Sequence, residues 1–497
     1  MFAHAAKRGA LTLFAAGMYC VAAQAQVHVK KGAVGGNGAD WLTPYGEMST
    51  AIDAIAANLH TGETELYVAE GTYYPGTLTT DFFQLPNGYS VYGGFLGQTS
   101  ETAPEFRLGS SANTILSGDI DNTPGTSGNS AHVVLIVGSV PLLDGFTIRD
   151  GFAGGHSFPL SGTGGGLVIW GTGPTAAGVS SLDMMVDCHF RDNTALRGGG
   201  IGGQFASMNM KFCSFHRNLA KDSGGAIWFD EFGPESFPLP TTTKTMSFFN
   251  SNFTNNVAGT ESANGRGSAI SLTNLKGIVH VYNSRFVDNV ILGQDGAGTV
   301  SIGHQGSKAA TGGTTANDVL FGHCSFAANQ AVSGASTPGI YFGDGRFFNI
   351  APKSIQNSIL FFNGGATVLS DSNIGGPGGR QNRVIVSSSD IQMPAGSQSP
   401  WVGTGNIMLD PQFVDFGLRN LELIYGSPCI NTGSNGAILA DVLNLDEDLD
   451  VTERTPYDLK RGNLRISTPL VPIGSPPPPP ASTDMGCHEV QGDFQAP

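Results

Sequence analysis

The sequence predicts an all-β fold, a right-handed parallel β-helix (a solenoid) with a short N-terminal capping helix. The first reason is a recurring phrase with Cys or Ser first, Phe third and Asn sixth. The second is the glycine-rich, apolar step that follows most copies, such as Gly224-Gly225-Ala226-Ile227. The third is composition: 71 residues are glycine and only 13% are charged, against a usual charged share of about 25%. The copies of the phrase begin at Cys188, Cys213, Ser251, Ser284 and Cys324.

Repeats of this kind cannot bury their own apolar face, so the copies must stack on one another. Phe190 and Phe215 are 25 residues apart, whereas Phe286 and Phe326 are 40 apart. This variation indicates that each coil has the same short strands and that loops of different length connect them. Residues two apart share one side of a strand, so Cys or Ser and Phe point inward together. We therefore expect an interior Phe stack, a small-residue column and an asparagine ladder. Phe146 resembles an upstream copy, and Leu360 with Asn363 resembles a degenerate later one.

The chain divides into four predicted segments. Residues 1–25 are a secretory signal, with Lys7-Arg8 before an apolar run and Ala23-Gln24-Ala25 as the cleavage site. Residues 26–110 form the N-terminal cap and the first coils, including a helix over Ser49–Leu59 that covers the open end of the solenoid. Residues 111–425 are the β-helix repeats. Residues 426–497 are a closing, anchor-like segment with a polyproline loop at Pro476–Pro480.

Charge limits the partners. The net charge is −15, and removal of Lys7 and Arg8 with the signal gives −15 − 2 = −17. Such a chain is a poor ligand for nucleic acid or an anionic membrane, and no later segment is long and apolar enough to span a bilayer. The charge is compatible with glycans, cell-surface components or divalent ions. We expect a monomer.

The cysteines suit an exported protein with at least one free thiol. Loss of Cys20 with the signal leaves 6 − 1 = 5 cysteines, an odd number. Cys188, Cys213 and Cys324 belong to the interior column, where they act as small buried apolar residues. Cys429 and Cys487 both lie in the C-terminal segment, and we predict a disulfide between them.

A cluster of charged side chains is the best candidate for a binding surface. Stacking places His189, Arg191 and Asp192 on one coil and His216 and Arg217 on the next, with Asp192 over Arg217. Such a patch can bind carboxylates. The same residues also suit a plain ladder of surface ion pairs worth about 0–1 kcal/mol, and this interpretation is favoured because the following coils do not extend the pattern. No catalytic residue can be assigned from the sequence.

An acidic run near the C-terminus is the candidate metal site. Asp446, Asp448, Asp450 and Glu453 alternate with other residues as in calcium-binding loops. The run lacks the glycine of an EF-hand, so it is not one. A structural Ca²⁺ and a solvated acidic loop both fit the pattern, and Ca²⁺ is the only cofactor that the sequence suggests.

Several segments resemble secreted bacterial β-helix proteins of the pectate-lyase-like superfamily. The stretches that carry the likeness are Tyr67–Tyr73, Tyr92–Phe95, Ile115–Asp119 and Leu143–Ile148. The Phe-x-x-Asn and Gly-Gly-Ala-Ile pairs resemble polymorphic outer-membrane-protein repeats. The tail, with Asp410–Asp415, Gly426–Gly433 and Asp484-Met485-Gly486, is similar to the choice-of-anchor Q domain. The resemblance implies the β-helix fold and an extracellular or outer-surface location.

Two functions of different class follow from the resemblance. The first is a non-catalytic exported protein for adhesion or glycan binding. The alternative is a polysaccharide lyase or glycoside hydrolase of the pectate-lyase-like kind. Sparse carboxylates and the absence of a recognisable lyase motif favour the first, because a lyase needs a base and a cation beside the substrate carboxylate.

Overall fold

The structure is a computed structural model of the 497-residue chain. It describes residues 25–123, 125–154, 162–173, 178–230, 244–260, 265–273, 277–293, 298–303, 318–332, 338–342, 353–364, 369–371, 384–392, 401–446, 448, 450–455, 458–459 and 483–489. Residues 1–24 of the predicted signal and the polyproline loop lie outside the described residues, whereas Ala25 begins the first strand.

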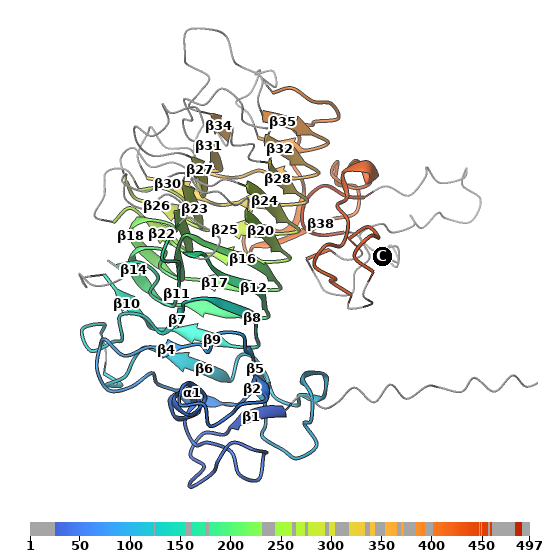
Figure 1. The fold of residues 1–497 in the computed structure, drawn as a ribbon. Coiled ribbons are helices and arrows are strands. Elements are labelled where there is room, and N and C mark those ends of the chain that lie inside the picture. The colour runs from blue at the N-terminus through green and yellow to red at the C-terminus, as the bar shows by residue number, and fades with distance from the viewer. Residues whose placement is uncertain are drawn as a thin grey trace, which may run out of the picture.

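The protein is a right-handed parallel β-helix, as predicted, built from four parallel sheets that run along its length (Figure 1). The chain visits sheets A, B, D and C in turn in each complete coil and then returns to sheet A one step further along the axis. Sheet A has 11 strands in the order β1 (Ala25–Val29), β2 (Glu63–Ala69), β5 (Ser90–Phe95), β8 (Ser139–Asp144), β12 (Ser180–Val186), β16 (Ala206–Lys211), β20 (Lys244–Phe249), β24 (Gly277–Tyr282), β28 (Asp318–Gly322), β32 (Lys353–Gln356) and β35 (Val384–Ser387).

The other three sheets have shorter strands. Sheet B has 10 strands: β3 (Gly71–Tyr73), β6 (Thr114–Ser117), β9 (Thr147–Arg149), β13 (His189–Arg191), β17 (Ser214–His216), β21 (Asn252–Thr254), β25 (Arg285–Val287), β29 (Ser325–Ala327), β33 (Ile359–Leu360) and β36 (Asp390–Ile391). Sheet D has six: β10 (Phe152–Ala153), β14 (Thr194–Arg197), β18 (Leu219–Ser223), β22 (Val257–Ala258), β26 (Val290–Ile291) and β30 (Gln330–Ala331). Sheet C has nine: β4 (Phe83–Gln84), β7 (Val134–Ile136), β11 (Leu167–Trp170), β15 (Ile201–Gln204), β19 (Ile227–Asp230), β23 (Ile270–Thr273), β27 (Val300–Gly303), β31 (Ile340–Phe342) and β34 (Leu369–Asp371).

The interior contains the predicted phenylalanine stack. Phe190, Phe215, Phe253, Phe286 and Phe326 are paired in register along sheet B, and each is fully buried. Neighbouring rings lie nearly parallel, with centroids 5.1, 4.9, 4.7 and 4.3 Å apart. Burial of one such side chain contributes about 1.5–3 kcal/mol, so the stack is a major part of the core.

An asparagine ladder follows the stack at the corner between sheets B and D. The Nδ2 of Asn218 donates to the Oδ1 of Asn256 at 3.1 Å, and Asn256 donates in the same way to Asn289 at 2.9 Å. Each Nδ2 also donates to a backbone carbonyl of the preceding coil, as Asn256 does to Phe215. The ladder begins at Asn193 and continues through Asn329 to Asn363, so the degenerate later copy is confirmed. Satisfying these buried amides explains why the corner needs Asn.

One coil is in a different register from the expected one. Phe146 was expected to join the phenylalanine stack, but the sheet pairing places Ile148 opposite Phe190. Phe146 therefore lies two residues earlier, in line with Cys188, in the column of small residues. That column otherwise consists of residues whose side chains bond the neighbouring backbone, as Ser251 does with the Phe249 carbonyl. The prediction failed because a lone Phe cannot show which inward position it fills.

The corners that flank sheet B use backbone in the left-handed region. Between sheets A and B it is adopted by Asp187, Phe212, Asn250, Asn283, His323, Asn357 and Ser388. Between sheets B and D it is adopted by Asp150, Asp192, Arg217, Asn255, Asp288, Ala328 and Phe362. Asn and Asp tolerate this conformation better than most residues. The glycine-rich step before sheet C does the same with Gly224 (φ 70°), where an added Cβ would lie 2.4 Å from the Ile227 carbonyl oxygen.

The N-terminal helix α1 (Met48–Ala56) lies at the first coils beside β1 and β4 (Figure 1). Met48, Ala51 and Ile55 are buried in the main core. The helix ends at Ala56, earlier than predicted, and Leu59 falls after it and is exposed. The helix begins at Met48, and Glu47 occupies its N-cap position. The role of the helix as a lid stays a prediction.

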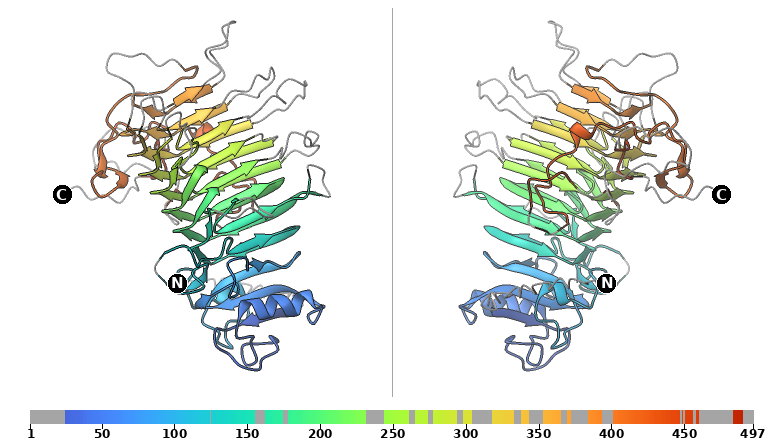
Figure 2. Two further views of the ribbon diagram at one scale, coloured as in Figure 1. Left: turned by 90° about the vertical axis from the view of Figure 1, so that its left-hand side faces the viewer. Right: turned by 90° about the vertical axis from the view of Figure 1, so that its right-hand side faces the viewer.

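The C-terminal segment lies outside the solenoid, against sheets A and B (Figures 1 and 2). It contains the antiparallel hairpin of β37 (Phe413–Asp415) and β38 (Asn420–Leu423). We call residues 407–446, 450–455, 458–459 and 483–489 the C-terminal cover. Its apolar residues form clusters with the outer faces of the later coils. The last named strand of the parallel sheets ends at Ile391, and isolated parallel bridges continue to Ile407, short of the predicted boundary at residue 425.

The cover is tied to coils far apart in sequence. Lys211 at the end of β16 donates to the carbonyls of Leu443 and Asn444, 3.1 and 2.7 Å away. Asn250 donates to the Asp458 carbonyl at 2.6 Å, and the Cys487 amide donates to Ser325 Oγ at 3.1 Å. The cover therefore spans the coils between Lys211 and Asp390. Among the described residues, none lies in a helix with the length and hydropathy of a membrane span.

Candidate functional site

The five predicted surface residues lie together on the outer face of sheet B. Arg149, Arg191, His216 and Thr254 form one row along the axis, because they occupy the same position in β9, β13, β17 and β21. Thr147, His189, Ser214 and Asn252 form the row beside it. We call this surface the sheet-B polar face; it comprises Arg149, Asp150, His189, Arg191, Asp192, His216 and Arg217. Successive strands of a sheet are about 4.8 Å apart, so its groups repeat at that interval.

Both histidines of the polar face are held by hydroxyl groups. His189 Nδ1 lies 2.7 Å from Ser214 Oγ, and its Nε2 lies 3.1 Å from Ser111 Oγ. His216 Nδ1 lies 2.9 Å from Thr254 Oγ1. Burial lowers the pKa of His189 and of His216, and the neighbouring Arg217 lowers the pKa of His216 further. At neutral pH the two rings are therefore uncharged hydrogen-bonding groups.

Asp192 forms the expected pair with Arg217 on the next coil. The Arg217 Nε and Nη2 donate to the two Asp192 oxygens at 2.7 and 2.9 Å, and this pairing raises the pKa of Arg217. Arg191 Nη1 is 3.6 Å from the same carboxylate. Asp192 is thus neutralised by its neighbours, and the Arg191 side chain, 38% exposed, presents N–H groups to solvent.

Sequence reasoning missed Arg149 and Asp150, which extend the polar face by one coil. Arg149 Nε is 3.2 Å from Asp150 Oδ2, and Ser117 Oγ donates to the same oxygen at 3.2 Å. Burial raises the pKa of Asp150, and the charges of Asp192 and Asp119 raise it further. The wrong register at Phe146 hid this coil, since it shifted Arg149 out of line with Arg191.

The polar face ends where the C-terminal cover begins. Val287 and Ala327 continue the row of Arg149 and Arg191, and both are 1% exposed. They pack with Leu421 and Leu423 of the cover. The open part of sheet B is therefore limited to the earlier coils.

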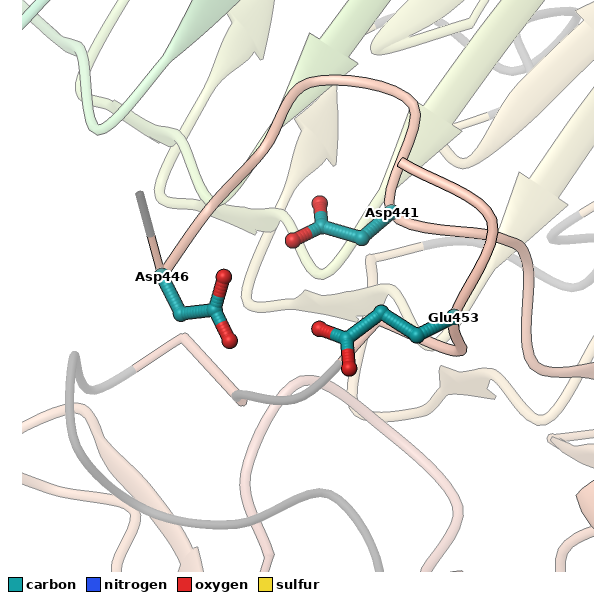
Figure 3. A group of neighbouring side chains, drawn as sticks. All are labelled: Asp441, Asp446 and Glu453. Carbon is teal, nitrogen blue, oxygen red and sulfur yellow. The ribbon is translucent and has the colours of Figure 1, made fainter. Parts of the chain in front are cut away.

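Of the four predicted calcium ligands, the structure brings together two. Asp446 and Glu453 approach Asp441, a residue that the sequence did not single out (Figure 3). One oxygen from each of the three lies within 4.8 Å of the others. Burial raises the pKa of Asp441 and that of Glu453, and the charge of Asp446 raises both further.

The other two predicted ligands face solvent. Asp450 Oδ1 accepts hydrogen bonds from the Thr452 amide and hydroxyl at 2.8 and 2.6 Å, and Asp448 Oδ1 accepts one from the Asp450 amide at 2.7 Å. Both residues are exposed. They shape the turn and do not join the cluster of three.

The predicted disulfide is wrong. Cys429 and Cys487 are buried and unbridged, as are Cys188, Cys213 and Cys324. Cys429 Sγ donates to Asp390 Oδ2 at 3.3 Å, whereas the backbone of Cys487 bonds Ser325 and Leu459. The two cysteines belong to the same cover but contact different coils. Burial and the proximity of Asp390 raise the pKa of Cys429, so its thiol stays protonated.

Comparison with known proteins gives only distant likenesses. No family model matches the sequence, and neither does any curated protein. Among solved structures, pectin methylesterase PemA from Erwinia chrysanthemi has 12% sequence identity and a TM-score of 0.30, covering 76% of this chain and 92% of that chain. The Streptococcus pneumoniae surface protein and adhesin PfbA has 10% identity and a TM-score of 0.29, covering 76% of this chain and 95% of that chain.

TM-scores this low transfer no function to this chain. The parallel β-helix is confirmed by the pairing of its own strands. The likeness to polymorphic outer-membrane-protein repeats and to the choice-of-anchor Q domain stays a prediction.

Proposed function

We propose that this is an exported protein that binds an extended glycan along the sheet-B polar face without cleaving it. The observation that carries the proposal is the row of Arg149, Arg191 and His216, one group per coil on an uncovered surface. A ladder of equivalent groups at a fixed interval suits a ligand that is itself a repeating chain. Export is inferred from the signal at residues 1–25.

The chemistry of the polar face suits recognition of hydroxyls and carboxylates. Arg191 offers N–H donors in a planar fork that matches a carboxylate. Both ring nitrogens of His189 are occupied by Ser214 and Ser111, whereas His216, held through Nδ1 by Thr254, can present Nε2 to a sugar hydroxyl. Because Asp192 is already paired with Arg217, the surface combines fixed geometry with little repulsion toward an acidic sugar. An acidic glycan is therefore the preferred ligand class.

Binding can be tested with immobilised polysaccharides. The mature protein and an Arg191→Ala/His216→Ala variant are compared on uronic-acid polymers and neutral glucans, and we expect the variant to bind at least about tenfold more weakly. Arg197→Ala is the matched control, because Arg197 pairs with Asp222 at 2.9 Å on sheet D, one coil apart as in the Arg217–Asp192 pair. Equal loss in the control, or binding of no polymer by the unchanged protein, would refute the proposal.

A second candidate function rests on Asp150. A carboxyl group whose pKa is raised by burial, beside the Arg149 guanidinium, has the properties of a general acid. This favours a lyase or hydrolase acting at the first coil of the polar face. Release of reducing ends or unsaturated products from any polymer, abolished by Asp150→Asn, would establish this function in place of simple binding.

A further inference from the structure

Three carboxylates converge in the C-terminal cover beside sheet A. Asp441, Asp446 and Glu453 come from two sides of one loop, and Figure 3 shows their carboxylates turned toward a common space. The loop is closed by the Asp441 amide, which donates to the Glu453 carbonyl at 2.8 Å, and by the Thr455 amide, which donates to the Leu439 carbonyl at 2.8 Å. The positions of the three side chains therefore follow from a paired backbone.

The buried member of the cluster has an unused acceptor. Asp441 is fully buried, and its Oδ2 accepts a hydrogen bond from the Leu445 amide at 2.6 Å. Its Oδ1 has less than 1 Å² of exposed surface and no hydrogen-bond partner among the described residues, and the same holds for Oε1 of Glu453. A buried carboxylate oxygen without a partner is costly, so the cluster calls for a positive group.

Protein cations only partly meet this need. Lys211 acts on Asp441 electrostatically, but its ammonium donates to the Leu443 and Asn444 carbonyls. Among the described residues, Lys211 is thus shared between Asp441 and these two carbonyls.

The spacing of the oxygens fits a divalent ion. Oxygens bound to one Ca²⁺ at about 2.4 Å lie at most about 4.8 Å from one another, and one oxygen from each of the three carboxylates meets that limit. A set of three carboxylates, which water and backbone carbonyls can complete to six to eight oxygen ligands, suits Ca²⁺ better than the strictly octahedral Mg²⁺.

We propose that Asp441, Asp446 and Glu453 bind one Ca²⁺ that fastens the C-terminal cover to sheet A. The site lies next to the Lys211 anchor on β16, where Leu443 and Leu445 pack on Phe249 and Tyr282. The ion closes the loop over this contact and so stabilises the cover on the coils beneath it. Asp448 and Asp450, which the acidic run suggested as ligands, are not part of the site.

The test is a calorimetric titration of the EDTA-treated full chain with CaCl₂, together with thermal unfolding. We expect one ion per chain, a dissociation constant of about 10⁻⁴ to 10⁻³ M, as in extracellular modules, and a higher melting temperature with calcium. Asp441→Asn and Glu453→Gln should each weaken binding at least about tenfold. Glu453 is half-buried, so Glu453→Gln gives the answer even if Asp441→Asn folds poorly.

Two controls separate this site from general acidity. Asp183→Asn makes the same charge change on the outer surface of β12, and Asp450→Asn makes it within the acidic run; both should bind calcium within about twofold of the unchanged chain. Absence of binding, loss of binding in Asp450→Asn with retention in Asp441→Asn, or equal binding of MgCl₂ would each overturn the proposal.

Discussion

The two halves of sheet B share one interior and have opposite exteriors. Inside, the phenylalanine stack from Phe190 to Phe326 and the asparagine ladder from Asn193 to Asn363 continue from the open half into the covered half. Outside, the row that starts with Arg149 and Arg191 ends with Val287 and Ala327. The inward residues thus specify the coil, and the outward residues decide whether solvent or the C-terminal cover lies against it.

The second outer row shows the same contrast through its titrating groups. His189 stands in the open half, and Asp390 occupies the equivalent position under the cover. Burial lowers the pKa of the histidine and raises the pKa of the aspartate to about 7, because in both cases it disfavours the charged form. The covered end of this row therefore carries a buried acid that titrates near neutral pH.

The largest effect should come from loosening the cover. Leu421 is 2% exposed and packs among the apolar residues of the later coils, so Leu421→Ala should lower the free energy of unfolding by about 2–5 kcal/mol. Urea denaturation measures the change. Asn252→Ala, in the open half, is the control, and its free energy of unfolding should stay within about 0.5 kcal/mol of that of the unchanged protein. Equal losses of unfolding free energy in the two variants would show that the two outer faces do not differ.

A smaller effect is expected from pH. The folded-state pKa of Asp390 lies above its unfolded value near 3.8, so the fold binds this proton more tightly than the unfolded chain does. Its contribution is fully present below about pH 4 and is lost as pH rises through about 7, on the order of 2–4 kcal/mol. Asp390→Asn, which cannot ionise, should therefore lose less stability than the unchanged protein between pH 4.5 and pH 8.

Denaturant melts of both proteins across that range measure the difference. If the free energy of unfolding changed equally with pH in both proteins, Asp390 would be solvated under the cover and the prediction would be wrong. His189→Gln provides the matched comparison from the open half. It should leave the dependence of the unfolding free energy on pH unchanged above pH 7, because a lowered pKa keeps His189 neutral there.

The smallest effect concerns two similar ion pairs. Arg217–Asp192 lies on the polar face, with side chains 56% and 29% exposed, and Arg419–Asp288 joins the cover to sheet B with values of 33% and 25%. Double-mutant cycles should give coupling energies of about 0–1 kcal/mol for both. The second should be the larger, because its side chains are less exposed and their attraction is less screened by solvent. The reverse order would contradict the contrast between the two halves.

The solenoid was predictable because its signal is local and repeated. Cys or Ser, Phe and Asn at fixed offsets specify which side chains point inward, and stacking then places Asp192 beside Arg217. Where the offset was ambiguous, at Phe146, the sequence could not choose between two inward positions, and the Arg149 coil was missed.

The cover could not be predicted in the same way, because it has no period. Its contacts join residues as far apart as Lys211 and Asn444, and no local pattern specifies such pairs. The metal site illustrates this. Asp441 precedes the acidic run and reaches Glu453 only because the backbone doubles back between Ala440 and Arg454. Cys429 and Cys487 show the converse, since nearness along one segment did not bring their sulfurs together.

The ties between the cover and distant coils have a consequence for how the molecule comes apart. Rungs that touch only their neighbours can peel away one at a time from a free end. The C-terminal cover is bonded to Lys211, Asn250 and Ser325 on different coils, so these coils must unfold together. Because the cover follows the coils in the sequence, a chain that is still being synthesised gains this cooperative resistance to mechanical unfolding only once the cover has been made.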